Sequence, residues 1–401
     1  MTDMHTIRWS DEIQLPKGFK AAGIAAGLKK ENRKDMALLV SEKPATMAGT
    51  FTTNQVQAAT VKLCRARLAS RTGRAVVINS GNANACTGEQ GRLDAERMAR
   101  LTGELTGLPP EQIYVSSTGR IGVQLPMEKI EAGIRLAVPA LSEKGGAEAA
   151  AAIMTTDTRP KTVTAQFEVD GKKIALTALA KGSGMIEPNM ATMLCYILTD
   201  AAVEAPALQA CLSTAVDQSF NRITVDGDRS TNDTVLFFAN GLAGNRPLNP
   251  GHPNWKLFEH AVQALTLKLA LKMVEDGEGV TKVITVRVRG GRTAQDAEAA
   301  ARSVANSLLV KTSWAGEYPN WGRVMDALGY SKAQVQEDKV DISYDDLPAC
   351  KNGLYAGAPI EDLKRVVRQK AFTLSINLNL GGGEAVVYTC NCTEEYVRIN
   401  M

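Results

Sequence analysis

The chain has 401 residues, 44% of them hydrophobic, so it is long enough to bury a sizeable core and to form two or more subdomains. Its 46 Lys and Arg residues against 43 Asp and Glu residues give a formal net charge of +3. Because no long run of like charges and no basic stripe interleaved with aromatic residues occurs, the sequence gives no support for a nucleic-acid partner. We expect a globular protein whose ligands are small molecules.

The amino-terminal segment and the cysteines indicate the expected cellular location and the state of the thiols. Residues 1–13 mix charged and polar residues where a secretory signal requires an apolar segment, and no later stretch reaches the ~18–20 apolar residues of a membrane span. We therefore expect a cytoplasmic protein without a membrane partner. The seven cysteines are odd in number and scattered, which suits reduced thiols. Cys390 and Cys392 fall on one face of an expected strand, but with only three histidines in the chain zinc is the weaker interpretation, and we expect no metal.

Strand-like and helix-like patterns alternate along the chain and predict an α/β fold. Expected strands span residues 75–80, 112–115, 162–169, 193–200 and 284–288, and expected helices span residues 90–105, 147–154, 208–216, 255–274 and 294–309. The segment GNANACTG (81–88) follows the first of these strands but lacks both GxGxxG and GxxxxGK[ST]. We therefore expect a tight turn there and no nucleotide site.

Two polar segments allow both a structural and a functional interpretation. VSSTGRIG (115–122) is typical of a polar loop with a glycine turn, but Thr118 and Gly119 also offer a hydroxyl and an N–H group that suit an oxyanion hole. Arg120 beside them either helps to bind an anion or points to solvent. TTDT (155–158) supplies turn and capping residues, or else hydrogen bonds to a small polar ligand.

The segment KGSGMIEPNMATML (181–194) places Thr192 directly before an apolar strand. If the backbone is cleaved before Thr192, the new α-amine, with a pKa of about 8, can act as the base that activates the hydroxyl of the same residue. Pro188 constrains the backbone that leads to this bond, which favours an N-to-O acyl shift. By residue type alone, however, a threonine before a strand is most often structural.

Acidic residues follow the long helix expected over residues 255–274. The segment EDGEG (275–279) places carboxylates where the helix macrodipole disfavours them. Either the turn is exposed and the carboxylates are solvated, or one of them binds a cation in a pocket.

Long motifs occur in a fixed order along nearly the whole chain. They are PKGFKAAGIAAGL, FTTNQVQAA, INSGNANACTG, SSTGRIG, KGSGMIEPNMATML, ITVDGDRSTND, EDGEGVTK, PNWGRV and YVRIN. On these motifs the chain resembles the ornithine acetyltransferases of the arginine-biosynthesis glutamate N-acetyltransferase family. Their length and order make them far more specific than a lone glycine motif.

The resemblance implies a precursor that cleaves itself between Ala191 and Thr192. An α chain of residues 1–191 and a β chain of residues 192–401 would remain packed together, and such chains commonly assemble as α2β2 or larger. The implied fold is α/β, with stacked sheets and flanking helices, similar to N-terminal-nucleophile hydrolases but differently connected.

The implied reaction transfers the acetyl group of N-acetyl-L-ornithine to L-glutamate through an acetyl-threonine intermediate. The family's nucleophile falls on Thr192 and its oxyanion-stabilising pair on Thr118 and Gly119. Its substrate contacts fall on Thr155, Lys181, Thr192, Glu278 and Asn400. In this interpretation Lys181 holds an α-carboxylate, and Glu278 pairs with the cationic amine of ornithine.

No metal or bound cofactor is required by the resemblance, whereas the use of acetyl-CoA as a second acetyl donor stays open. Two other functions also stay open. One is an amidohydrolase or aminopeptidase that uses the same N-terminal threonine with water as acceptor, and the other is an uncleaved binding protein without catalysis.

Overall fold

The computed structural model describes residues 6–187 and 193–401. The chain forms two compact units, each discontinuous in sequence. The first comprises Met1–Asn221 and Arg229–Ala270, and the second comprises Arg222–Asp228 and Leu271–Met401. This division concerns packing, whereas the expected α and β chains concern cleavage of the backbone after residue 191, so those chains stay a prediction.

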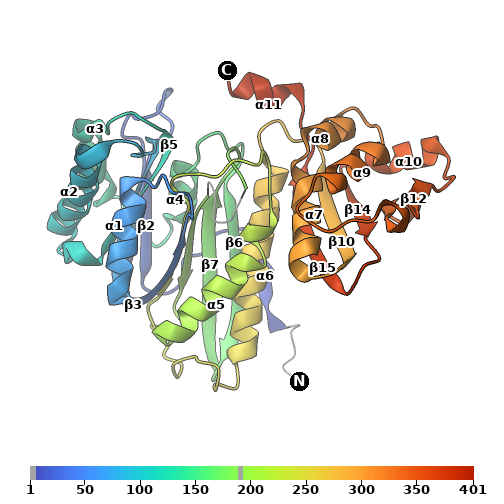
Figure 1. Ribbon diagram of the computed structural model, residues 1–401. Coiled ribbons are helices and arrows are strands. Elements are labelled where there is room, and N and C mark those ends of the chain that lie inside the picture. The colour runs from blue at the N-terminus through green and yellow to red at the C-terminus, as the bar shows by residue number, and fades with distance from the viewer. Residues whose placement is uncertain (1–5, 188–192) are drawn as a thin grey trace. The chain divides into compact units, whose positions relative to one another are not determined.

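Within its described residues, the first unit forms a nine-stranded sheet in the order β1-β6-β7-β8-β9-β3-β4-β5, with β2 paired to β3. The strands are β1 (Arg8–Ser10), β2 (Phe19–Ile24), β3 (Met36–Phe51), β4 (Thr72–Asn82), β5 (Ile113–Arg120), β6 (Lys161–Val169), β7 (Lys172–Lys181), β8 (Leu194–Thr199) and β9 (Thr234–Ala239). The helices are α1 (Ala59–Arg67), α2 (Gly88–Thr106), α3 (Met127–Ala137), α4 (Gly146–Ala152), α5 (Ala205–Asp217) and α6 (Trp255–Glu275), the last of which continues into the second unit (Figure 1).

The large sheet is buried on both faces, which explains its continuous apolar strands. Side chains alternate along a strand, so Leu39 and Val76 belong to one core cluster while Leu38 and Val77 belong to another. Every residue of β8 is buried. Apolar runs such as LCYILT are therefore core strands, as the sequence predicted.

Helix α6 packs against the sheet through an aromatic side chain. The ring of Phe258, which is fully buried, stacks on Phe237 of β9 with 6.2 Å between ring centroids and an interplanar angle of 16°. It also meets Phe167 of β6 at 6.5 Å. These contacts hold α6 against strands β6 and β9 of the large sheet (Figure 1).

The second unit forms a smaller sheet, six-stranded within its described residues, in the order β13-β12-β11-β14-β10-β15. The strands are β10 (Val283–Gly291), β11 (Asp341–Tyr344), β12 (Leu347–Lys351), β13 (Leu354–Tyr355), β14 (Ala371–Asn377) and β15 (Gly383–Cys390). The helices are α7 (Ala294–Asn306), α8 (Leu308–Ala315), α9 (Trp321–Gly329), α10 (Ile360–Val367) and α11 (Glu394–Ile399). Across the two units, short 3₁₀ helices occur at Leu68–Ser70, Pro110–Gln112, Phe220–Arg222 and Glu337–Lys339.

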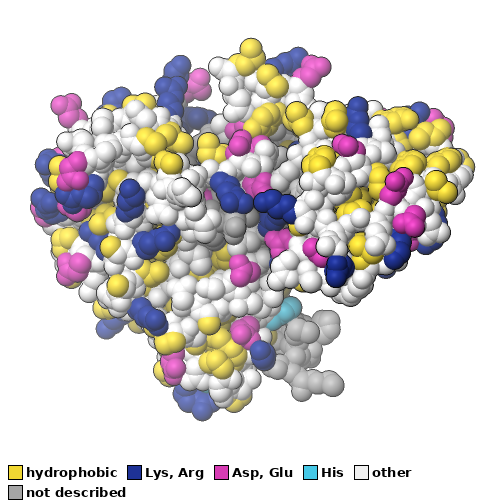
Figure 2. Space-filling model, viewed as in Figure 1, with side chains coloured by type: hydrophobic (Ala, Val, Ile, Leu, Met, Phe, Trp, Pro, Cys, Tyr) yellow, Lys and Arg dark blue, Asp and Glu magenta, His cyan; other side chains and the backbone are white. Residues whose placement is uncertain are grey.

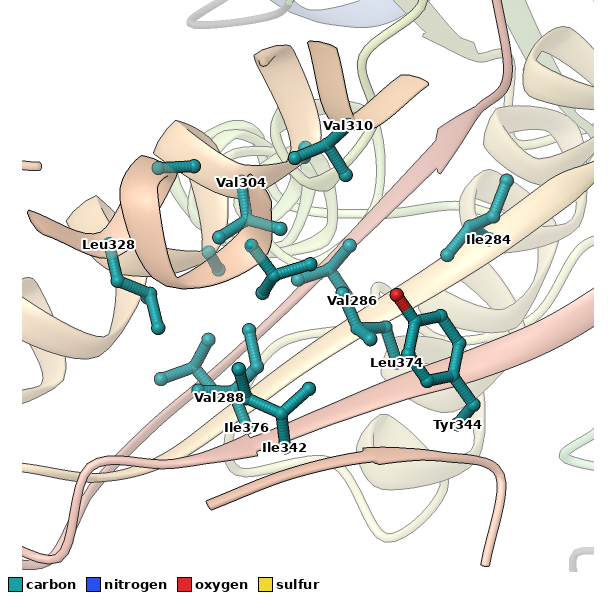
Figure 3. Close-up of a cluster of buried hydrophobic side chains, with 14 of the residues drawn as sticks. Ile284, Val286, Val288, Val304, Val310, Leu328, Ile342, Tyr344, Leu374 and Ile376 are labelled. Carbon is teal, nitrogen blue, oxygen red and sulfur yellow. The ribbon is translucent and has the colours of Figure 1, made fainter. Parts of the chain in front are cut away.

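The core of the second unit follows from the alternation in β10. Val286 and Val288 point toward α7 and α9, where Val304 and Leu328 complete the cluster together with Leu374 of β14 (Figure 3). All five side chains are fully buried. The apolar residues of the period-two pattern in residues 284–288 thus form part of the buried face of this sheet.

The predicted α/β class, with sheets flanked by helices, is confirmed, but two element predictions need correction. The helix expected over residues 294–309 is two helices, because Ser307 leaves the helical conformation and its side chain accepts the N–H of Val310 as the N-cap of α8. Strand β15 ends at Cys390, so Cys392 lies beyond the strand and the two thiols do not share a strand face.

The surface agrees with the small net charge. On the face that Figure 2 shows, Lys and Arg side chains are interspersed with Asp and Glu. None of the helices in the described part of the chain combines the length and the apolar character that a membrane crossing requires.

Replacing Phe258 tests the packing of α6. Phe258→Ala should lower the free energy of unfolding by about 3–5 kcal/mol, because it removes a fully buried ring and leaves a cavity. Chemical denaturation followed by circular dichroism measures this loss. The control Val56→Ala, at a side chain that is 50% exposed, should change stability by less than about 0.5 kcal/mol. A loss below about 1 kcal/mol for Phe258→Ala would contradict the packing described.

Candidate active site

The predicted oxyanion-hole residues lie at the end of a strand. Strand β5 runs parallel to β4, and the pairing continues through Ser80–Thr118 and Gly81–Gly119. The expectation of a loop beginning at residue 115 is therefore wrong, because this parallel pairing carries β5 to Arg120. Thr118 is 4% exposed, whereas Gly119 is exposed. The pair thus lies where the buried sheet opens to the surface.

Only glycine fits at position 119. Its φ of +132° lies in a region that side chains disfavour, and a Cβ atom there would lie 2.3 Å from the carbonyl carbon of Gly81. The backbone of β5 therefore approaches β4 closely at this point. Arg120 is exposed, which favours the interpretation that its side chain points to solvent.

The side chain of Asn232 holds the end of β5 by hydrogen bonds. Its Nδ2 donates hydrogen bonds to the carbonyl oxygens of Ser117 (2.7 Å) and Ala83 (2.6 Å), and its side chain is 5% exposed. The Ser117 hydroxyl donates to Oδ1 of Asn79 at 2.6 Å. Thr118 is thus preceded by a residue whose main chain and side chain are both held. Sequence reasoning missed Asn232 because its partners lie 115 and 149 residues away.

A buried carboxylate organises the second group of predicted residues. Asp157 accepts hydrogen bonds from Lys161 Nζ at 2.6 Å and from the N–H groups of Thr155 (2.9 Å) and Gly182 (2.8 Å). Its Oδ2 lies 3.9 Å from Lys181 Nζ. Asp157, Lys161 and Lys181 are 6%, 0% and 2% exposed. One carboxylate therefore positions both Thr155 and Lys181, the two predicted substrate contacts of this group.

The charges around Asp157 decide whether its carboxyl group is protonated. Burial alone would raise the pKa of Asp157, but the positive charges of Lys181 and Lys161 outweigh burial and hold it well below its usual range. Asp157 is therefore a carboxylate at neutral pH. Whether the threonines of TTDT form a turn or bind a ligand stays open. The sequence did not reveal that Asp157 lies beside Lys181.

Lys29 connects the glycine-rich segment near the amino terminus to the Thr155 segment. Its Nζ donates to the carbonyl oxygens of Met154 (2.5 Å) and Lys34 (2.8 Å). Burial, and next the positive charge of Arg33, lower the pKa of Lys29 to about 8. Its role is thus to fix the backbone just before Thr155.

Ser80 joins the two groups of the first unit. It pairs with Thr118 in the sheet, and its hydroxyl donates to the carbonyl oxygen of Ala152 at 2.6 Å. Ala152 is three residues before Thr155. The strand end with Thr118 and the segment with Thr155 are therefore neighbours in the first unit.

Met193, the second residue after the predicted cleavage bond, is held from both sides. The N–H of Met193 donates to Oδ1 of Asp233 at 2.8 Å, and the carbonyl oxygen of Met193 accepts the N–H of Thr234 at 3.0 Å. Ala191 and Thr192 lie outside the described residues. The cleavage site and the nucleophile therefore stay predictions.

In the second unit, the structure brings together two predicted substrate contacts that are 122 residues apart. Asn400 Nδ2 donates to Glu278 Oε2 at 2.7 Å and to the carbonyl oxygen of Tyr396 at 2.9 Å. The contact arises because α11 packs on the turn after α6, where the Thr393 hydroxyl donates to the carbonyl oxygen of Gly279 at 2.7 Å.

Burial corrects the interpretation of the acidic turn at residues 275–279. Glu275 is exposed, as expected for a solvated turn, but Asp276 and Glu278 are only 6% and 8% exposed. An exposed turn is thus the wrong description for the latter two. The part of the chain that the structure describes contains no cluster of three side chains suited to binding a metal ion.

Comparison with known proteins gives the family. The model described as ArgJ family matches residues 20–401. The arginine biosynthesis bifunctional protein ArgJ of Symbiobacterium thermophilum is 51% identical over 390 residues, covering 97% of each chain. The same-named protein of Caldanaerobacter subterraneus is 46% identical over 393 residues, again covering 97% of each chain. A crystal structure of ArgJ from Bacillus halodurans is 39% identical, covers 51% of this chain and 97% of that chain, and has a TM-score of 0.49.

The chain therefore belongs to the ArgJ family. The predicted family and the predicted enzyme class, an acyltransferase of arginine biosynthesis, are confirmed. The interpretation as a binding protein without catalysis is set aside.

Asp157→Asn tests the buried ion group. The variant should lose about 3–5 kcal/mol of unfolding free energy at pH 7, because two buried ammonium groups lose the carboxylate that faces them. The pKa of Asp157 is depressed in the folded state, so its contribution is present above the unfolded value of about 3.9 and is lost as pH falls. Denaturation curves should thus show a large difference between wild type and variant that is nearly constant from pH 7 to about pH 5 and shrinks as the pH falls below about 4.

The control is Glu361→Gln, which removes an exposed carboxylate paired with Lys364 and should leave stability nearly unchanged. An equal effect of the two substitutions, or a difference for Asp157→Asn that does not depend on pH, would contradict the role assigned to Asp157.

Proposed function

We propose that this chain is a glutamate N-acetyltransferase that transfers the acetyl group of N2-acetyl-L-ornithine to L-glutamate, within the cyclic pathway of arginine biosynthesis. The observation that carries the proposal is the pair of groups in the first unit, a strand end with Thr118 and Gly119 and a neighbouring buried cluster that holds Lys181. Membership in the ArgJ family supports the same reaction.

The first half-reaction forms an acetyl-enzyme. After self-cleavage between Ala191 and Thr192, the α-amine of Thr192 accepts the hydroxyl proton while the hydroxyl oxygen attacks the acetyl carbonyl carbon. The hydroxyl of Thr118 and the N–H of Gly119 stabilise the oxyanion of the tetrahedral intermediate. The amide bond then breaks, the proton passes to the leaving nitrogen, and ornithine departs.

The second half-reaction reverses these steps with glutamate as acceptor. Donor and acceptor share an α-carboxylate, and the ammonium group of Lys181 is suited to bind it in both. Thr155 adds a hydroxyl to the same part of the site. One cationic residue for the common group explains how a single nucleophile can serve two different amino acids.

The side chains of the two substrates differ in charge. In the second unit, Glu278 offers a buried carboxylate for the terminal amine of ornithine, and Asn400, which is bonded to it, offers an amide group that is compatible with either charge. We assign these two residues to substrate discrimination.

Assembly and co-substrates complete the proposal. The cleaved α and β chains assemble as α2β2, and the reaction needs no resident cofactor or metal, because the nucleophile, the base and the oxyanion donors are all protein groups. The relatives named above carry the word bifunctional in their names, which supports acetyl-CoA as a second acetyl donor.

The central test uses self-cleaved enzyme with each donor in turn. With N-acetylornithine and glutamate, initial rates should give parallel double-reciprocal lines, as expected for a ping-pong reaction. Thr192→Ala should remain a single full-length chain and transfer no acetyl group. Intersecting lines would contradict the acetyl-threonine intermediate, and rapid acetate release without glutamate would favour the amidohydrolase alternative.

Thr118→Val tests the oxyanion hole. It replaces a hydroxyl by a methyl group of similar size in a buried position, so folding should be retained while kcat falls by about 10²–10³-fold. The control Thr214→Val, at an exposed threonine of α5, should leave kcat unchanged. A Thr118→Val enzyme with wild-type kcat would remove Thr118 from the mechanism.

A further inference from the structure

The six-residue helix α11 lies in close contact with the turn that follows α6, both in the second unit. Gly279 of the turn has a φ of +68°, and a Cβ atom there would lie 2.6 Å from the main-chain nitrogen of Tyr396. The Thr393 hydroxyl donates to the carbonyl oxygen of Gly279 at 2.7 Å. The backbone of α11 therefore approaches the turn as closely as a glycine allows.

The side chain of Tyr396 ties α11 to a second segment of the same unit. Its hydroxyl donates to Oδ2 of Asp226, which is 170 residues earlier in the chain, at 3.3 Å. Burial, and next the negative charge of Asp226, raise the pKa of Tyr396, so the hydroxyl keeps its proton and acts as the donor. Asp226 also accepts the N–H of Asp228 at 3.2 Å. Tyr396 is thus anchored at its hydroxyl end, outside α11 itself.

The main chain of Tyr396 fixes the orientation of the Asn400 amide. Nδ2 of Asn400 donates both to the carbonyl oxygen of Tyr396 at 2.9 Å and to Oε2 of Glu278 at 2.7 Å. A main-chain carbonyl oxygen and an ionised carboxylate can only accept hydrogen bonds. The amide nitrogen, and not the amide oxygen, must therefore face Tyr396 and Glu278.

This orientation leaves two oxygen atoms for a ligand. Oδ1 of Asn400 and Oε1 of Glu278 accept no hydrogen bond from the residues that the structure describes, and Glu278 is only 8% exposed. Both atoms are acceptors, so a ligand must supply donors. An alkylammonium group has three, whereas an ionised carboxylate has none. An amide can in general meet either charge, but Asn400 in this orientation favours the cationic group.

We propose that Tyr396 is a positioning residue that determines specificity, because it holds Asn400 as an acceptor beside Glu278. The pair then binds the terminal amine of N-acetylornithine and does not bind the side-chain carboxylate of glutamate. This inference rests on the proposed function, which assigns Glu278 and Asn400 to substrate discrimination. Tyr396 acts through Asn400 and needs no contact with the substrate.

Tyr396→Phe tests the assignment in self-cleaved enzyme, because it removes the hydroxyl bonded to Asp226 and keeps the ring and the main chain. In a ping-pong reaction, kcat/KM for each substrate reports its own half-reaction. The value for N-acetylornithine should fall about tenfold, which corresponds to the loss of roughly one net hydrogen bond. The value for glutamate should stay within about twofold of wild type, whereas general loosening of the structure would lower both values.

Two further variants give the range of the measurement. Tyr355→Phe removes a hydroxyl that donates to the carbonyl oxygen of Ala358, at a side chain of β13 that is 54% exposed. Both kcat/KM values should match wild type. Glu278→Gln removes the charge that the terminal amine meets, so it should lower the N-acetylornithine value more than Tyr396→Phe does.

A double-mutant cycle tests the route through Asp226. Asp226→Ala removes the acceptor of the Tyr396 hydroxyl. If that hydrogen bond transmits the effect, adding Tyr396→Phe to Asp226→Ala should lower kcat/KM for N-acetylornithine by less than about twofold further. The full tenfold fall in the double variant would show that the two residues act independently.

Each result decides the assignment. A fall confined to the N-acetylornithine value in Tyr396→Phe, with Tyr355→Phe unaffected and the effect absorbed by Asp226→Ala, supports it. An unchanged N-acetylornithine value, an equal fall of both values, or independent effects in the double variant would overturn it. If wild type transfers no acetyl group, or Glu278→Gln leaves the N-acetylornithine value unchanged, the proposed function fails as well, and these two readings distinguish that failure.

Discussion

The described site of the first unit depends on one buried ion group, in which the carboxylate of Asp157 holds Lys161 and Lys181. Charges removed from water are costly unless they are paired and hydrogen-bonded. Here the carboxylate also accepts the backbone N–H groups of Thr155 and Gly182. The electrostatic requirement of the core thereby fixes two separate segments of chain, one before β6 and one after β7.

Strand register then carries this constraint from Lys181 to Leu194. Lys181, the last residue of β7, pairs with Leu194, the first residue of β8, and Leu194 also pairs with Thr234 of β9. Residues 181 and 194 are therefore fixed side by side, at the end of the β7–β8 pair. This pairing holds both ends of the segment 181–194 on rigid strands of the scaffold.

The sequence alone predicted what depends on local pattern and missed what depends on distant partners. The apolar run of β8 and the long α6 appear in the structure nearly as expected, because each buries a face that its own residues define. The break at Ser307 was hidden by helix-forming residues on both sides. The family motifs named Glu278 and Asn400, but their direct contact depends on α11 packing on a turn more than a hundred residues away.

Two buried carboxyl groups near Lys181 show how position sets chemistry. Asp157 is surrounded by two ammonium groups and backbone donors, which favour its charged form. For Asp233 burial dominates and raises the pKa, and the N–H of Met193, the charge of Lys181 and the Thr52 hydroxyl offset only part of this effect. The same side chain is therefore an anion in one place and a neutral acid in the other.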